Sequence, residues 1–280
     1  MDITLLLDQI FPLFKFTDLN YYDLLSLFFL CVMRVAPIVA LAPFLGFKLP
    51  GPVKMGLTFM LAILALPKAI MTTHSHVIFN PEYLVFALKE ILVGSIFAIL
   101  ATIPFYVAQA AGVLIDFSRG SSSLTVNDPI MQTQISPIGV LYNYLMIVIF
   151  FEVNGPFLFI DAVIQSYQLL PADRFLPAAF FGNDVTFWKG IFKIANQVAT
   201  VTLQIAAPSV VAVLMADLFL GIANRLAPNV QIIFLGTGFK SLLGLLLMFL
   251  GWTYILQQLG IQGIHWIRDF EKLVSFLRSG

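Results

Sequence analysis

The sequence predicts an all-α integral membrane protein with bent and broken helices, and three observations support this. Hydrophobic residues make up 60% of the 280-residue chain, charged residues only 11%, and the mean hydropathy is +0.95. Soluble domains are roughly 45–50% apolar and about 25% charged. The apolar residues gather in six segments, each near or above the ~20 residues that a helix needs to cross a bilayer. Prolines or charged residues interrupt every segment, which indicates kinks and breaks rather than straight helices.

In chain order, the six apolar segments are Tyr22–Leu45, Val53–Met71, Tyr83–Val107, Ile138–Ile164, Val198–Ala223 and Ile232–Leu256. Charged residues within them or at their edges are Arg34, Lys68, Lys89, Glu90, Glu152, Asp161, Asp217 and Lys240. The interrupting prolines are Pro37, Pro43, Pro67, Pro104, Pro156 and Pro208. Irregular backbone at membrane depth is tolerated only where protein covers it or water reaches it. We therefore expect helical hairpins that turn back at depth.

A polar stretch at 112–137 separates the third apolar segment from the fourth. It carries Asp116, Arg119, Asp128, a run of serines and two prolines. Hydrocarbon offers no partners for such side chains, so the stretch must lie in water, inside protein, or along a water-filled cavity. A solvent-exposed loop is the simpler interpretation. A loop folded back into a central pathway is the other, and the residues alone leave both open.

The charges inside the apolar segments allow two hypotheses. Ionisable side chains at membrane depth usually face a bundle interior or a wet cavity. Glu152, Asp161 or Asp217 could relay protons or ions. Alternatively, they are structural partners of cations within the membrane: Arg34, Lys89, Arg225 or Lys240. Both signs occur in similar numbers and can neutralise each other, which favours structural pairing.

Signatures of catalysis, cofactor binding and nucleic-acid binding are absent from the sequence. His74 and His76 have no nearby cysteine, and no pair of metal ligands stands at the helical spacing of intramembrane zinc proteases. The serine run at 121–123 has no histidine base at a recognisable offset. The formal net charge is zero and no basic tract occurs. We expect a protein without cofactor, metal or enzymatic activity.

The two ends of the chain differ in character from the apolar segments. The N-terminus lacks the basic region of a cleavable signal peptide. In the tail, apolar residues recur at helical spacing from Ile264 to Leu277, with charged residues facing away. This pattern predicts an amphipathic helix that lies on a membrane surface or docks on a partner, and the residues do not decide between these. The loops expected on one side of the membrane carry seven lysines and arginines, and those on the other side carry four. This difference is too small to decide the orientation of the chain in the membrane.

Several short motifs occur together and in one order along the chain. They are 34–37 (Arg-Val-Ala-Pro), 42–46 (Ala-Pro-Phe-Leu-Gly), 112–116 (Gly-Val-Leu-Ile-Asp), 127–129 (Asn-Asp-Pro), 136–139 (Ser-Pro-Ile-Gly), 150–155 (Phe-Phe-Glu-Val-Asn-Gly) and 217–221 (Asp-Leu-Phe-Leu-Gly). With them, the chain resembles the T component of the type III secretion export apparatus, the injectisome counterpart of the flagellar export-gate R protein. Each motif is weak alone, but their joint order from Tyr22 to about Leu256 is specific.

The resemblance implies a non-enzymatic subunit, present once in a cone-shaped helical assembly with R and S partner subunits. The U switch component is a further expected partner. The assembly would form the entry portal for unfolded effectors and needle or rod subunits in the bacterial inner membrane. Family members raise much of their helical mass out of the bilayer plane, so part of this chain is expected in the periplasmic space. Sister subunits would then satisfy the charges and breaks that lipid cannot.

The resemblance also implies roles for particular residues. The polar stretch corresponds to the family's plug loop, which favours its placement in the pathway, and the plug residues would be Gly112, Asp116, Arg119, Gly120, Ser121, Ser122, Asp128 and Pro129. Residues expected at structural positions or subunit interfaces are Arg34, Pro37, Pro43, Glu152, Pro208, Asp217, Gly221, Arg225, Pro228 and Lys240. The expected regions are N-terminal hairpins (1–107), the plug-like loop (108–137), a central hairpin (138–197), a C-terminal helix pair (198–256) and the amphipathic tail (257–280).

A rival function is a secondary transporter with discontinuous helices and an ion site at the membrane midplane. Asp217, Glu152 and the prolines support it. The sequence lacks the matched pair of interrupted segments that such transporters carry in their two halves. An intramembrane hydrolase ranks third, because no base–nucleophile or metal pattern occurs.

Overall fold

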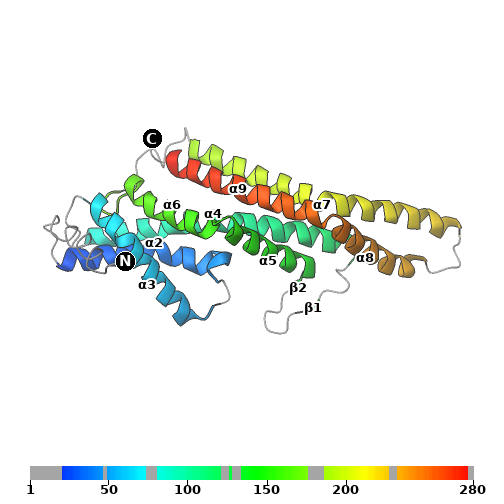
Figure 1. Ribbon diagram of the computed structural model, residues 1–280, viewed down its shortest axis with the longest axis horizontal. Helices are drawn as coiled ribbons and strands as arrows, with labels where there is room; N and C mark the ends of the chain where they lie inside the picture. Colours follow the sequence, from blue (N-terminus) through cyan, green and yellow to red (C-terminus); the bar gives the residue numbers. More distant parts are fainter. Residues whose placement is uncertain are drawn as a thin grey trace. The chain divides into compact units, whose positions relative to one another are not determined.

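The computed structural model describes the backbone of residues 21–46, 49–73, 81–120, 126–127, 134–175, 186–226 and 232–276 (Figure 1). The elements are α2 (Tyr21–Leu41), the short 3₁₀ helix η1 (Pro43–Leu45), α3 (Gly51–Thr72), α4 (Pro81–Ser118), β1 (Val126–Asn127), β2 (Gln134–Ile135), α5 (Pro137–Glu152), α6 (Gly155–Leu169), α7 (Thr186–Leu226), α8 (Ile232–Leu250) and α9 (Trp252–Phe276). Apart from the two short strands, every described element is helical. The predicted all-α class is therefore confirmed.

The described residues contain four helices long and apolar enough to cross a membrane, or six candidate spans if each of two bent pairs counts as one. The bent pairs are α5 with α6, and α8 with α9; the bend between α8 and α9 is 64°. At the first break Asn154 takes a left-handed conformation with a φ of 56°, which asparagine tolerates better than most residues. The second break falls at Gly251. The prediction of broken helices is confirmed, and both breaks lie inside apolar segments.

Helix ends differ from those of the apolar segments at three places. The helix α4 continues past Val107 to Ser118, α7 begins well before Val198, and the tail belongs to α9, which is continuous from Trp252. Residues 108–118 are thus helical, and the predicted loop begins later than expected. A helix extends beyond its apolar segment where its polar side chains find protein or water, and hydropathy does not record such partners.

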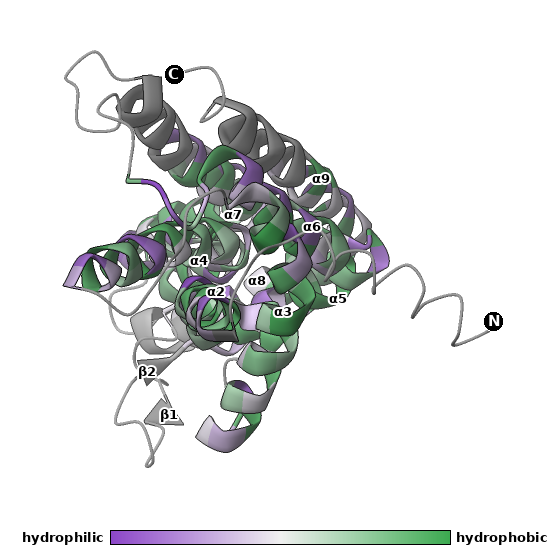
Figure 2. Ribbon diagram, turned by 90° about the vertical axis from the view of Figure 1, so that its left-hand side faces the viewer, coloured by the Kyte–Doolittle hydropathy of each residue, from purple (hydrophilic) through white to green (hydrophobic). Residues whose placement is uncertain are grey.

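The chain divides into two compact units. The first comprises 1–102, 157–185 and 270–280, and the second comprises 103–156 and 186–269. In the first unit, small residues of α3 such as Ala62 and Ala65 pack against α2 around the buried Cys31 and Tyr167. Apolar residues predominate along α3 (Figure 2), and only 22% of the most apolar stretch of this helix is buried. That helix therefore offers an apolar surface to lipid or to other proteins.

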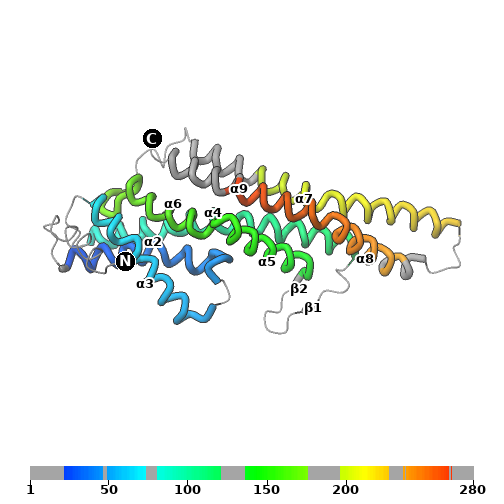
Figure 3. Tube along the Cα trace, viewed as in Figure 1, coloured from blue at the N-terminus to red at the C-terminus, as the bar shows by residue number. Residues whose placement is uncertain are grey.

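The second unit packs the end of α4 against α5, and α8 against α7. Phe105 of α4 meets Phe150 of α5 edge to face, with ring centroids 5.3 Å apart, and Tyr142 and Met146 are buried on the same side of α5. Along the chain, α7 is followed by α8 and α9 (Figure 3), and α7 contacts α8. Together, α4, α5, α7 and α8 position the ends of the polar stretch.

Candidate functional site

One buried carboxylate holds both ends of the polar stretch. Asp116 lies in the last turn of α4 and is 3% exposed. Its Oδ1 pairs with the guanidinium of Arg119, and its Oδ2 accepts hydrogen bonds from the Ser136 hydroxyl and from the backbone N–H of Ile138, the latter at 3.0 Å. Charge-assisted hydrogen bonds of this kind are stronger than neutral ones. The chain therefore leaves and returns at the same point, which we call the loop base (Asp116, Arg119, Ser136 and Ile138).

Ser136 has a second role, because it also begins α5. Its Oγ accepts a hydrogen bond from the N–H of Gly139 at 2.9 Å, and Pro137 follows at the first helical position. A serine cap of this kind stabilises a helix by about 0.5–2 kcal/mol relative to alanine, and proline suits the first turn, where its missing N–H is not needed. The motif at 136–139 thus serves as a helix start and as one half of the loop base.

Two glycines let α4 and α5 approach at their backbones. A Cβ added at Gly112 would lie 2.6 Å from the Cα and the N of Gly139. A Cβ added at Gly139 would lie 3.0 Å from the carbonyl oxygen of Gln109. Beside this contact, Asn143 donates a hydrogen bond to the Gln109 side chain at 3.1 Å. This close crossing sets the spacing that lets Asp116 reach Ser136 and Ile138.

Arg119 extends the loop base to α8. It is 7% exposed, and its Nη1 lies 3.5 Å from the Ser241 hydroxyl. A Cβ added at Gly244 would lie 2.6 Å from the Cδ of Arg119 and 2.8 Å from its Cγ. Its buried Nε has no hydrogen-bond partner among the described residues. After Arg119, Gly120 has a φ of 78°, a conformation that glycine adopts at little cost.

Within the polar stretch, the structure describes one short antiparallel pairing, in which Val126 opposes Ile135 and Asn127 opposes Gln134. Four of the predicted plug residues lie outside the described residues: Ser121, Ser122, Asp128 and Pro129. Of the others, Gly112 and Asp116 belong to α4 rather than to a loop, and Arg119 and Gly120 follow it directly. The described part of the predicted plug is therefore its base.

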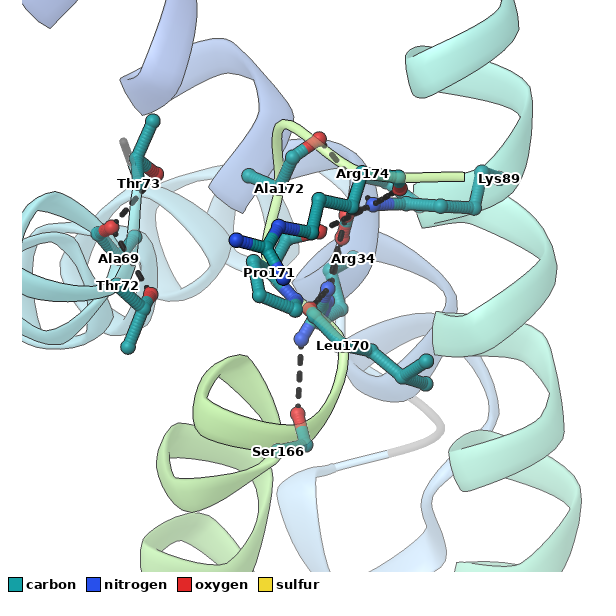
Figure 4. Close-up of polar contacts among 11 residues, drawn as sticks. Arg34, Ala69, Thr72, Thr73, Lys89, Ser166, Leu170, Pro171, Ala172 and Arg174 are labelled. Atoms are coloured by element: carbon teal, nitrogen blue, oxygen red, sulfur yellow. Dashed lines mark hydrogen bonds and ion pairs between the residues drawn. The ribbon is translucent and has the colours of Figure 1, made fainter. Parts of the chain in front are cut away.

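A second polar cluster lies in the first unit, around the fully buried Arg34 of α2 (Figure 4). Its guanidinium forms a two-pronged ion pair with Glu90 of α4, with 2.8 Å between Nη2 and Oε1. It also donates to the Ser166 hydroxyl at 2.9 Å and to the carbonyl oxygen of Leu170 at 2.7 Å. The ring centroid of Tyr167 lies 3.7 Å from its Cζ. One arginine thus joins α2 to α4, to α6 and to the residue after α6.

Lys89 completes this cluster from the neighbouring position on α4. Its ammonium donates to the carbonyl oxygens of Pro171 at 2.7 Å, Ala172 at 3.2 Å and Arg174 at 3.0 Å (Figure 4). It also lies 2.8 Å from Glu90. Charged groups buried away from water need such partners, because an unpaired one is costly. These contacts are those of a structural clamp on the segment that follows α6.

A glycine permits the central pairing of this cluster. A Cβ added at Gly94 of α4 would overlap the carbonyl oxygen of Arg34 and would lie 2.9 Å from its carbonyl carbon. The backbones of α2 and α4 are therefore in contact, one turn from Glu90. The predicted partners of Arg34 were Glu152, Asp161 and Asp217, whereas its partner in the structure is Glu90. The available signal was that Arg34 and Glu90 are opposite charges within two apolar segments.

The remaining predicted residues are dispersed. Asp217 of α7 and Lys240 of α8 form an ion pair, with 41% and 23% of their side chains exposed. Glu152 and Asp161 are exposed, and Asp161 accepts a hydrogen bond from Gln165 at 2.7 Å. Pro37 and Pro208 lie inside helices, Pro43 begins η1, Gly221 and Arg225 are exposed on α7, and Pro228 lies outside the described residues. Among the described side chains, no group of three or more potential metal ligands could hold an ion.

Comparison with known proteins gives one consistent result. The sequence model of the family described as "Bacterial export proteins, family 1" matches residues 25–262. The chain is 25% identical over 229 residues to the secretion system apparatus protein SsaT of Salmonella typhimurium, covering 81% of this chain and 82% of that protein. It is 32% identical over 161 residues to the Yop proteins translocation protein T of Yersinia pestis, covering 57% and 60%. It is 28% identical over 219 residues to the flagellar biosynthetic protein FliR of Bacillus subtilis, covering 78% and 83%.

Proposed function

This chain belongs to bacterial export protein family 1, and from that premise we propose that it is a structural subunit of the type III secretion export gate, helping to form and close the entry portal for unfolded secreted proteins. As a family member with several apolar helices, it is a component of a type III secretion or flagellar export apparatus and a multi-pass inner membrane protein. The portal role, the closing loop and a part raised into the periplasmic space belong to the proposal.

The observation that carries the proposal is the loop base. A gate needs a polar segment that can occupy a pathway and is fixed at its root. Here the carboxylate of Asp116 fixes the root from both sides, within a packed contact of α4 and α5.

The proposed partners are the R and S components of the export apparatus, with one copy of this chain per complex, together with the U switch component. The proposed substrates are unfolded effectors and needle or rod subunits. Large apolar side chains exposed along α3 and α7, among them Met60, Ile63, Leu218 and Phe219, supply surface for partners or lipid. We assign the chain no enzymatic role, because the buried charges Arg34, Lys89 and Glu90 are occupied by contacts within the fold.

A secondary transporter is not favoured. Its support was a carboxylate poised for ion relay, but Asp217 pairs with Lys240 and Glu152 lies exposed at the end of α5. Purification in mild detergent separates the two functions. An export-gate subunit should carry R- and S-like partners, whereas a transporter should run alone or as a homo-oligomer.

Deleting Gly120–Ser123 is the direct test of the proposed closure. We expect the complex to assemble with its partners but to leak ions at rest, because a shortened loop no longer reaches across the pathway while the loop base is retained. The measurement is the resting conductance of purified complexes in a planar bilayer. A variant with glycine at 121–123 keeps the loop length and should stay closed. Unchanged conductance in assembled deletion complexes would remove the plug assignment.

Replacing Asp217 with alanine tests the role of the C-terminal helices in subunit packing. As an exposed pair in water, Asp217 and Lys240 would contribute at most about 1 kcal/mol. Beneath lipid or a partner, however, a lone Lys240 ammonium is costly. We expect a lower yield of partners in affinity purification, and partial recovery when the two charges are exchanged (Asp217→Lys with Lys240→Asp). A full yield of Asp217→Ala complexes would contradict this role.

A further inference from the structure

We propose that Arg119 is a positioning residue that couples the loop base to α8, so that the placement of α8 decides whether the loop is held in its closed state. The inference rests on the proposed function of the loop as the closing element of the gate. It assigns to the C-terminal helix pair a role in controlling that closure.

Arg119 belongs to the loop base. This residue directly follows α4 and precedes Gly120. Its guanidinium pairs with the same carboxylate that receives Ser136 and Ile138 from the other end of the loop. A displacement of this guanidinium therefore alters the group that holds both ends together.

Arg119 also contacts α8. Ser241 and Gly244 are three residues apart and thus share a helix face, and both lie against Arg119. The missing side chain of Gly244 provides the room for the Cγ and Cδ of Arg119. Gly238 stands on the same helix, and nothing lies within 4 Å of a Cβ added there. Of these two glycines, Gly244 therefore faces Arg119, and Gly238 faces open space among the described residues.

The Arg119 side chain is 8% exposed, and its Nε lacks a partner among the residues that the structure describes. Within the described part of the chain, its charge is balanced by Asp116, and it makes one further, long contact to Ser241. Removing the partner of a buried charge is costly, so a shift of α8 that carries Arg119 along must also rearrange Asp116. Lys240, next to Ser241, forms an ion pair with Asp217 of α7. A movement of α7 and α8 together would therefore displace the residues that contact Arg119.

The decisive experiment compares Gly244→Ala with Gly238→Ala in the assembled complex. Both variants add one methyl group to the same helix and raise helix propensity equally. We expect Gly244→Ala to displace Arg119 and to raise the resting ion conductance several-fold, and Gly238→Ala to leave it unchanged. Equal conductance of the two variants in assembled complexes would overturn the inference.

Variants of Arg119 itself show whether the effect passes through this residue. Arg119→Met keeps the apolar stem and removes the charge, and we expect it to leak. Adding Gly244→Ala to Arg119→Met should then raise the conductance no further, because interacting sites are non-additive. Arg119→Lys should restore part of the closure.

The outcomes separate this inference from the proposed function. If the deletion of Gly120–Ser123 leaks while Gly244→Ala and Arg119→Met stay closed, the coupling is refuted and the plug assignment stands. If the deletion stays closed as well, the proposed closing function fails. Should Gly244→Ala impair assembly, Arg119→Met against Arg119→Lys in intact complexes decides the question, since a purely structural role would change yield but not conductance.

Discussion

Replacing Glu90 with alanine is expected to destabilise the fold by about 3–5 kcal/mol, the range for removing one partner of a buried ion pair. Arg34 and Glu90 are both 0% exposed, and the carboxylate also lies 2.8 Å from Lys89. Its loss would remove the carboxylate that two buried cations share. Among the described residues, Arg34 would retain two neutral acceptors, the Ser166 hydroxyl and the Leu170 carbonyl. Thermal unfolding of the purified protein in detergent, followed by circular dichroism, measures the effect.

Two controls sharpen this test. Glu152→Ala removes an exposed carboxylate from the end of α5, and it should change the melting temperature little. The double variant Arg34→Met with Glu90→Leu removes the central charges together, and apolar replacements of a whole buried pair are often nearly neutral. It should therefore melt closer to the wild type than Glu90→Ala does. If Glu90→Ala and Glu152→Ala melt alike, Glu90 is not the central partner that the geometry indicates.

The class of the fold could be predicted from the sequence because hydropathy records the solvent that each segment prefers. The break between α5 and α6 could be predicted too, since Gly155 with Pro156 interrupts an otherwise helical stretch, whereas the break at Gly251 is known only from the structure. The family could be recognised for a different reason. Short motifs at 34–37, 112–116 and 136–139 keep their order along the chain, and several now have a physical explanation in buried charge, helix crossing and helix capping.

The partners of individual charges could not be predicted, because they depend on how helices rotate against each other. Arg34 and Glu90 are 56 residues apart, and the sequence places Glu90 beside Lys89 without indicating that it also pairs with Arg34. The rotation of α4 against α2 depends on Gly94, because any side chain there would overlap the backbone of Arg34. The end of α4 was misplaced for a related reason. Asp116 is a polar residue that favours a loop by composition, yet its partners at 136 and 138 keep it within the helix.

Gly112→Ala is expected to destabilise the second unit by about 1–3 kcal/mol, the usual range for overpacking. In an unobstructed helix the same change stabilises by about 0.5–1 kcal/mol, so the sign of the effect tests the geometry. The added methyl group would meet the backbone of Gly139 at 2.6 Å, and backbone cannot rotate aside as a side chain can. The measurement is the melting temperature of the purified complex, with Gly238→Ala as the matched change in open space.

The consequence of Gly112→Ala should extend to the loop base. Separating α4 from α5 draws the Ile138 N–H and the Ser136 hydroxyl away from Asp116, since both are carried by the start of α5. Complexes that still assemble should therefore leak ions at rest, as the loop deletion does. A variant that melts below the wild type but remains closed would show that the helix crossing stabilises the fold without holding the loop. A variant that melts at or above the wild type would refute the close crossing itself.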